Sequence, residues 1–264
     1  MFFSERLFYA IVLMMELKEF FDLHPQTALA FSGGTDSAYL LYAACRYAEK
    51  VRAYYVKTAF QPAFEMEDAV RLAGELNAEL SIVELDILRE DAVTRNGPDR
   101  CYECKKRIFG AIAEAAARDG FSVLLDGTNA SDDAADRPGM RALKELSVLS
   151  PLKLCGLTKA DVRRLSREAG LFTWDKPAYA CLATRIPTGR PLDERLLKRT
   201  EAAEDALSRM GFRDFRIRTL GEAARLQLTE RQLPLAIEKR GEIKEKLMPL
   251  YEAVLLDLEV RIEQ

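Results

Sequence analysis

A cysteine in a polar connector is the residue of this 264-residue chain that most directly suggests chemistry. Cys181 lies in Asp-Lys-Pro-Ala-Tyr-Ala-Cys-Leu-Ala-Thr-Arg, residues 175–185, whereas a packing cysteine normally sits inside a helix or strand. A thiolate is a nucleophile, and nearby cations lower the pKa of a thiol. Lys176 and Arg185 flank Cys181 and could also accept an anionic substrate. We therefore predict a reactive thiol, with a structural thiol in a rigid loop as the alternative.

Two further cysteines have the Cys-x-x-Cys spacing. By themselves, Cys101 and Cys104 are compatible with a zinc, redox or iron–sulfur role. Together with Cys181 they provide three thiolates, one fewer than the four that fully ligate a cubane cluster. Cys45 and Cys155 are interpreted as packing residues. An odd total of five cysteines, without a convincing export signal, indicates reduced thiols, and the single histidine argues against a multi-histidine metal site.

A glycine pair between an apolar run and a helical pattern is a candidate phosphate loop. The loop contains Ser32, Gly33, Gly34, Thr35, Asp36 and Ser37. Adjacent glycines let backbone N–H groups turn toward a ligand, and a helix N-terminus adds donors and a favourable dipole. The Gly-Lys-Ser/Thr of a Walker A loop is absent, which indicates a different nucleotide chemistry. The alternative is a glycine turn in which Thr35 or Asp36 merely caps the next helix.

Other polar residues fall where ligand contacts are expected. Asp126, Thr128 and Asn129 close an apolar strand, where they could touch a nucleotide or a reacting carboxylate, or form a turn with Asx hydrogen bonds. Guanidinium groups suit bidentate binding of phosphate or carboxylate. Arg137 and Arg141 flank Pro-Gly-Met, and Arg216 and Arg218 alternate so that both point to one face of a predicted strand. An ordinary solvent-exposed strand face would show the same alternation.

Strand and helix patterns alternate in the first part of the chain. Strands are predicted over 27–31, 51–58, 79–86 and 121–127, and helices over 38–48, 65–78, 104–120 and 158–170. This order predicts an α/β fold with a doubly wound parallel sheet whose ligand lies beyond the carboxyl ends of the strands. A helix over 193–211, strands near 214–220, 223–229 and 253–260, and a helix over 233–247 predict a small α+β part. We therefore expect two domains, 1–190 and 191–264.

Composition limits the class of partner. The formal net charge of -3, with 39 Lys plus Arg against 42 Asp plus Glu, gives no general electrostatic argument for nucleic acid binding. The apolar stretch 7–15 is too short to span a bilayer, follows Glu5 and lacks a cleavage motif, so we interpret it as part of a helix running to about residue 21. We expect a cytoplasmic protein without a membrane partner.

The hexapeptide Ser-Gly-Gly-Thr-Asp-Ser resembles the signature of the PP-loop ATP pyrophosphatases. Within that group, the segments 100–109, 126–143, 149–152, 174–189 and 215–228 resemble the LarE-type pyridinium-3,5-biscarboxylic acid mononucleotide sulfurtransferases, over residues 15–259. This resemblance implies cleavage of ATP between the α- and β-phosphates, Mg²⁺ near Asp36, and conversion of the substrate carboxylates to thiocarboxylates through adenylates. The product would enter nickel-pincer nucleotide cofactor biosynthesis.

The resemblance also assigns roles to residues. It implies that Cys181 is the sulfur centre, with Asp36 and Arg185 as further catalytic residues. The favoured interpretation is a [4Fe–4S] cluster on the three cysteines that carries the sulfur; the alternatives are sacrificial donation by Cys181, which leaves dehydroalanine, and structural zinc. We expect five residues to bind the substrate: Arg137, Arg141, Lys176, Arg216 and Arg218.

The resemblance also bears on assembly and on partners. We expect a homo-oligomer and a hand-over of product to a nickel-inserting enzyme. Gln227 stands where relatives commonly have glutamate, so any acid function at that position is in doubt. A PP-loop transfer RNA thiolase is a competing reading, although this chain lacks the additional cysteine pairs of some of those enzymes. An amidating PP-loop ligase and a nucleotide-binding sensor are further alternatives.

Overall fold

The computed structural model describes residues 15–132 and 138–262. These fall into two compact units, each assembled from separate stretches of chain. The first contains the chain up to Val56, Glu65–Val83 and Lys105–Lys176. The second contains Lys57–Phe64, Glu84–Cys104 and the chain from Pro177 onward. The single domain boundary near residue 190 stays a prediction.

A four-stranded parallel sheet organises the first unit. Its strands are β1 (Gln26–Ala30), β2 (Lys50–Lys57), β3 (Glu79–Glu84) and β4 (Leu124–Leu125), in the order β3-β2-β1-β4. The central strand β1 pairs with β2 on one side and with β4 on the other, where Ala28 lies opposite Leu124. Both faces of a parallel sheet must be covered, and for that reason β1 reads as a continuous apolar run. The predicted α/β class with a parallel sheet is confirmed.

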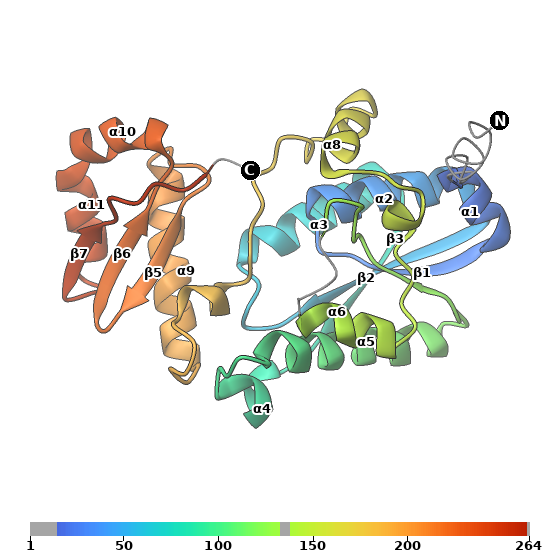
Figure 1. The fold of residues 1–264 in the computed structure, drawn as a ribbon, viewed down its shortest axis with the longest axis horizontal. Coiled ribbons are helices and arrows are strands. Elements are labelled where there is room, and N and C mark those ends of the chain that lie inside the picture. Colours follow the sequence, from blue (N-terminus) through green and yellow to red (C-terminus); the bar gives the residue numbers. More distant parts are fainter. Residues whose placement is uncertain (1–14, 133–137, 263–264) are drawn as a thin grey trace, which may run out of the picture. The chain divides into compact units, whose positions relative to one another are not determined.

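Helices cover both faces of this sheet. Figure 1 shows α2 and α3 over one face and α5 and α6 over the other. On α2, apolar residues at helical spacing, among them Leu40, Leu41 and Ala44, are completely buried. The helices are α1 (Leu17–Leu23), α2 (Thr35–Tyr47), α3 (Ala63–Glu75), α5 (Arg100–Arg118), α6 (Pro138–Glu145), α7 (Pro151–Leu154) and α8 (Lys159–Glu168).

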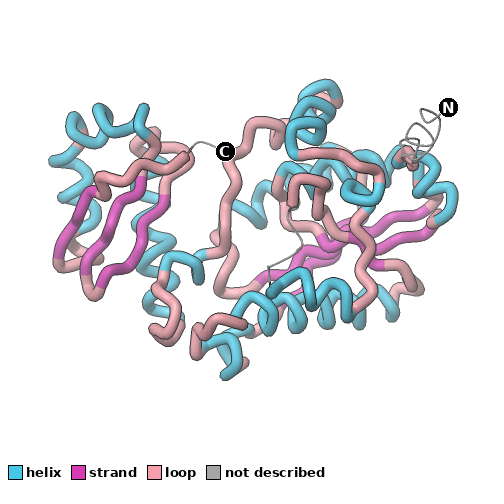
Figure 2. Tube along the Cα trace, in the orientation of Figure 1, coloured by secondary structure: helices cyan, strands magenta, loops and turns pink. Residues whose placement is uncertain are grey.

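The second unit carries a smaller mixed sheet. Strands β5 (Arg216–Leu220) and β6 (Ala223–Gln227) form an antiparallel hairpin, and β7 (Ala253–Leu256) adds parallel to β6. Figure 2 shows these three strands with helices packed beside them. The helices are α4 (Asp91–Thr94), α9 (Glu194–Arg209), α10 (Leu233–Glu238) and α11 (Arg240–Leu247), with 3-10 turns η1 (Ile87–Arg89), η2 (Leu182–Arg185) and η3 (Glu230–Gln232).

Some predicted elements differ in extent. The single helix expected over 233–247 is two helices, since Lys239 separates α10 from α11. The strand expected over 121–127 pairs only at β4, so its polar end forms a loop. The predicted N-terminal helix to about residue 21 corresponds, among the described residues, to α1, which begins at Leu17 after the N-cap Glu16. Residues 7–14 of that prediction lie outside the described residues. Within the described ranges, no helix is long and apolar enough to cross a bilayer.

Candidate active site

The predicted phosphate loop connects β1 to α2. Gly34 is the N-cap of α2 in extended conformation, and no side chain caps this helix end, so the simple capping alternative does not describe the turn. Gly33 has φ +70°, a conformation that favours glycine. A Cβ on Gly33 would lie 3.0 Å from the Glu65 carbonyl oxygen of α3. The glycine is therefore required by both the turn and the packing.

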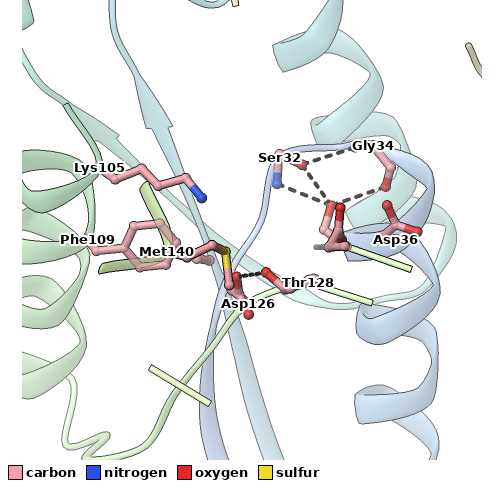
Figure 3. A pocket seen from close by; sticks show the side chains of 12 residues that line it. Ser32, Gly34, Asp36, Lys105, Phe109, Asp126, Thr128 and Met140 are labelled. Carbon is pink, nitrogen blue, oxygen red and sulfur yellow. Dashed lines mark hydrogen bonds between the residues drawn. The ribbon is translucent and has the colours of Figure 1, made fainter. Parts of the chain in front are cut away.

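Two serine hydroxyl groups brace the loop. Ser32 N–H donates to Ser37 Oγ (3.3 Å), and Ser37 Oγ donates to the Gly34 carbonyl oxygen (3.1 Å). The two hydroxyl oxygens are 3.0 Å apart (Figure 3). Thr35 Oγ1 donates to the Thr173 carbonyl oxygen at 2.8 Å, which connects the loop to the segment before the cysteine connector. The loop is thus preorganised with its helix N-terminus open toward a cavity.

Asp36, in the first turn of α2, has a partner at only one of its two carboxylate oxygens among the described residues. Its Oδ2 receives the Lys159 ammonium at 2.6 Å. Its Oδ1 is buried and has no hydrogen-bond partner among the described residues. A buried carboxylate oxygen without a partner is costly, and it is a suitable ligand for a hard cation such as Mg²⁺. Asp36 therefore fits the predicted magnesium contact.

The end of β4 lies beside the loop. Asp126 accepts hydrogen bonds from Thr128 Oγ1 and from Ser150 Oγ, the latter at 2.6 Å. Asn129 Oδ1 accepts from Ser131 N–H at 2.8 Å, which is the Asx-type turn considered as the alternative for this segment. Asp126 and Thr128 line the cavity, while Asn129 is buried in the turn.

Gly127 is a site residue that the sequence did not single out. A Cβ there would approach the Ser37 backbone nitrogen to 2.9 Å. The carbonyl end of β4 therefore touches the first turn of α2, and only glycine permits this contact.

These elements enclose a cavity of about 350 Å³. It is lined by Ala30, Ser32, Gly34, Asp36, Ser37, Lys105, Phe109, Asp126, Gly127, Thr128, Asp132 and Met140. Lys105 and Phe109 are four residues apart on α5 and so share one helix face, which is the sequence signal that could have identified them. Figure 3 shows the Lys105 ammonium directed to the side where Ser32 lies. Within the described ranges, Lys105 has no hydrogen-bond or ion-pair partner.

The predicted substrate residues of the first unit have other contacts. Lys176 Nζ pairs with Asp68 Oδ2 at 2.6 Å and donates to the Gly33 carbonyl oxygen at 3.3 Å, so it steadies the phosphate loop. Arg141 lies exposed on α6, 3.9 Å from Glu145. Arg137 lies outside the described residues. Their roles in substrate binding stay predictions.

The three motif cysteines belong to the second unit. Cys181 is the N-cap of η2 and packs, with Cys104, against a buried apolar cluster that includes Phe60 and Leu182. Cys101 is exposed in the first turn of α5. All five cysteines are free thiols in this structure.

Arg100 connects the two cysteine segments. Its Nη1 donates to Asn96 Oδ1 (2.6 Å) and to the Ala183 carbonyl oxygen in η2 (2.9 Å), while Nη2 lies 3.6 Å from Cys101 Sγ. Arg100 was not identified from the sequence. It brings a cation toward the Cys181 segment from α5.

The thiols nevertheless do not form a metal site as they stand. Among the described residues, no three or more His, Cys, Asp or Glu side chains are close enough to hold a metal ion together. Cys101, Cys104 and Cys181 would have to draw together before they could ligate a cluster. This arrangement does not fit a preformed [4Fe–4S] site.

The electrostatics of Cys181 differ from the expectation. Burial raises the pKa of its thiol, and the opposing effects of Arg100 and Arg185 are smaller. The expected lowering by cationic neighbours was therefore wrong in its net direction. Lys176, the other cation predicted to lower this pKa, belongs to the first unit, whereas Cys181 belongs to the second.

Arg185 is the centre of a buried network. Its guanidinium pairs with both oxygens of Glu204, Nε to Oε1 at 2.8 Å and Nη2 to Oε2 at 3.1 Å. Nη1 donates to the Ala180 carbonyl oxygen at 2.8 Å, beside Cys181. Tyr179 OH also donates to Glu204, at 2.6 Å. Arg185 thus shapes the Cys181 loop, and its catalytic role stays a prediction.

Arg216 and Arg218, which alternate on β5, donate hydrogen bonds to the backbone of the Cys181 loop. Arg216 Nη2 donates to the Ala178 carbonyl oxygen, and Arg218 Nη1 donates to that of Thr184 at 2.7 Å. Burial, then repulsion from other arginines, lowers the pKa of Arg216 to about 10. Burial and Arg185 likewise lower the pKa of Arg218. The region carries an excess of positive charge that an anion would relieve.

Gln227, the position that departs from the relatives, bridges two charged groups. Its Oε1 accepts from Arg218 Nε, and its Nε2 donates to Asp257 Oδ2 at 2.8 Å. The hydrogen bond from Gln227 lowers the pKa of Asp257. An acidic group therefore remains next to this position, supplied by Asp257.

Comparison with known proteins adds independent information. No family model matches the chain. It is 32% identical over 236 residues to the pyridinium-3,5-bisthiocarboxylic acid mononucleotide synthase of Lactiplantibacillus plantarum, covering 88% of this chain and 86% of that protein. It is also 32% identical over 249 residues to an uncharacterised protein of Synechocystis sp., covering 92% of each. The tRNA-specific 2-thiouridylase MnmA of Thermotoga sp. is 24% identical, covering 55% of this chain and 52% of that protein.

Proposed function

The chain belongs to the LarE-like family of PP-loop ATP pyrophosphatases, enzymes of ATP-dependent sulfur transfer, and we propose that it acts on pyridinium-3,5-biscarboxylic acid mononucleotide. It would convert the two carboxylates to thiocarboxylates, one after the other, and so supply nickel-pincer nucleotide cofactor biosynthesis. The observation that carries the proposal is the cavity in which the phosphate loop, the Asp126 loop and Lys105 meet.

The first unit is suited to the adenylation step. A substrate carboxylate oxygen attacks the α-phosphorus of ATP, the bond between the α-phosphorus and the bridging oxygen breaks, and pyrophosphate leaves with the electron pair. Backbone N–H groups at the start of α2 and the Lys105 ammonium would stabilise the pyrophosphate. Asp36 would contact the Mg²⁺ that accompanies ATP. The product is an acyl-adenylate.

The second unit is suited to the sulfur step, with Cys181 as the sulfur centre. In the direct route the Cys181 thiolate attacks the adenylate, AMP leaves and a thioester forms. Removal of the Cys181 Cα proton and cleavage of its Cβ–S bond then release the thiocarboxylate and leave dehydroalanine. Arg216 and Arg218 are proposed to receive the anionic substrate, because their surroundings carry excess positive charge.

A [4Fe–4S] cluster is the second proposal for the sulfur source. Cys101, Cys104 and Cys181 would hold it, and it would supply the sulfur in place of the Cys181 thiol, so that the cysteine is not consumed. The location of all three in one unit supports this idea, but their present separation requires a local rearrangement. Iron and acid-labile sulfide in anaerobically purified protein, about four of each per chain, would support it. A mass loss of about 34 Da after turnover, that of hydrogen sulfide, would indicate dehydroalanine instead.

The overall function is tested by pyrophosphate release. Wild-type protein with Mg-ATP should release pyrophosphate only when the pyridinium mononucleotide is added. Cys181→Ala should still release pyrophosphate without forming thiocarboxylate, whereas Asp36→Asn should lose both; Cys45→Ala, on the exposed side of α2, is the matched control. Pyrophosphate release that depends on transfer RNA, and weakens with salt, would instead favour the transfer RNA thiolase reading.

We further propose a homo-oligomer that passes its product to the nickel-inserting enzyme.

A further inference from the structure

Three lysines surround the phosphate loop, and they differ in how they are held. Lys105 has no hydrogen-bond or ion-pair partner within the described ranges. Lys176 is bound both to Asp68 and to the Gly33 carbonyl oxygen, and its side chain is 16% exposed. Among the described residues, the Lys159 ammonium contacts Asp36 alone, at 2.6 Å, and its side chain is 33% exposed. Of the two paired lysines, Lys159 is the one that can exchange its partner.

The backbone of Lys159 is fixed, so that only its side chain can respond. Lys159 is the first residue of α8, directly after the N-cap Thr158, which forms a capping box with Asp161. Its backbone N–H donates to Ser131 Oγ at 3.0 Å, which anchors it to the loop after β4. The flexible four-carbon stem can therefore redirect the ammonium without moving the helix.

The Lys159 ammonium pairs with only one of the two Asp36 carboxylate oxygens. Oδ2 has the Lys159 ammonium, but buried Oδ1 has no hydrogen-bond partner among the described residues. Asp36 lines the cavity, whereas Lys159 is outside its lining. A divalent cation entering this cavity with the phosphates would meet a carboxylate whose counter-ion, Lys159, does not line the cavity.

Building on the proposed function, we propose that Lys159 is an exchangeable counter-ion and a positioning residue for ATP. It neutralises Asp36 in the nucleotide-free protein. Once a divalent cation neutralises the carboxylate, Lys159 is released and turns to the phosphates, which bring more negative charge than the cation removes. The loop is thereby kept from binding metal alone and binds metal and phosphate together.

The test measures binding without any sulfur acceptor. Mn²⁺ binding to nucleotide-free protein is followed by electron paramagnetic resonance, and Mg-pyrophosphate binding by calorimetry. In Lys159→Met, Mn²⁺ should bind about tenfold more tightly and Mg-pyrophosphate about tenfold more weakly, the change expected for one charge-assisted hydrogen bond. The matched control is Arg164→Met, which removes an exposed charge from the same helix, and both constants should stay within about twofold.

A double variant and a second replacement make the outcome decisive. In an Asp36→Asn background, Lys159→Met should no longer tighten Mn²⁺ binding, because the ion pair is already absent. Lys159→Gln should reproduce the shifts if the methionine variant folds poorly. Failure of either constant to shift, or a Mn²⁺ effect that persists in the Asp36→Asn background, overturns the proposal. Wild-type protein that does not bind Mg-pyrophosphate at all would instead overturn the proposed adenylation site.

Discussion

Replacement of Gly127 by alanine tests the contact that closes the phosphate site. The added Cβ would lie 2.9 Å from the Ser37 nitrogen and 3.1 Å from its Cα. Both are backbone atoms in the first turn of α2, so neither can swing aside as a flexible side chain would. The clash can be relieved only if the loop after β4 and the start of α2 separate.

The cost follows from this geometry. Overpacking a tight contact typically destabilises a protein by about 1–3 kcal/mol. For a protein of about this size, each kcal/mol lowers the melting temperature by roughly 2–4 °C. Because the displaced segment carries Ser37 and Asp126, the affinity for Mg-pyrophosphate should fall by at least about tenfold.

Thermal unfolding and calorimetric titration with Mg-pyrophosphate measure the two effects. Gly110→Ala is the matched control, because Gly110 lies inside α5 and nothing lies within 4 Å of its added Cβ. That variant should be stabilised by up to about 1 kcal/mol, since alanine favours helix more than glycine does. A Gly127→Ala protein with unchanged melting temperature and affinity would refute the packing argument.

Three further outcomes are expected. Glu204→Gln should destabilise the protein by about 3 kcal/mol in a denaturant titration, because it leaves the Arg185 cation buried without a counter-charge. Glu222→Gln, at a carboxylate 42% exposed, should cost much less in the same titration. Alkylation of Cys181 by iodoacetamide, followed by mass spectrometry, should accelerate through pH 9 and beyond without a plateau near neutrality, because burial raises the pKa of its thiol. The unfolded state deprotonates this thiol first, so its contribution to stability is complete below pH 9 and declines above it; a plateau near pH 7 would contradict this reasoning. Gly33→Ala should lower stability by at least about 1–2 kcal/mol, measured by thermal unfolding. That amount is the cost of the left-handed conformation for alanine, and the approach of the added Cβ to the Glu65 carbonyl oxygen increases it.

The parallel sheet and the phosphate loop could be predicted because their signals are local. An apolar run, a glycine pair and a helical period occupy neighbouring positions, and each corresponds to a backbone requirement that a few residues express. The broken helix between α10 and α11 was missed because apolar periodicity continues across Lys239. The short pairing of β4 was missed because the length of a strand depends on its neighbours.

The sequence by itself determined which residues could do chemistry: a glycine loop before a helix, a cysteine in a rigid connector, and arginines alternating on a strand. Tertiary structure alone decided their partners. Lys159 meets Asp36 from 123 positions away, and Lys176 meets the phosphate loop although it is a sequence neighbour of Cys181. It also decided that burial, more than the nearby cations, governs the Cys181 thiol. The physical reason is that conformation is a local property of the chain, whereas charge pairing and desolvation depend on distances that only folding creates.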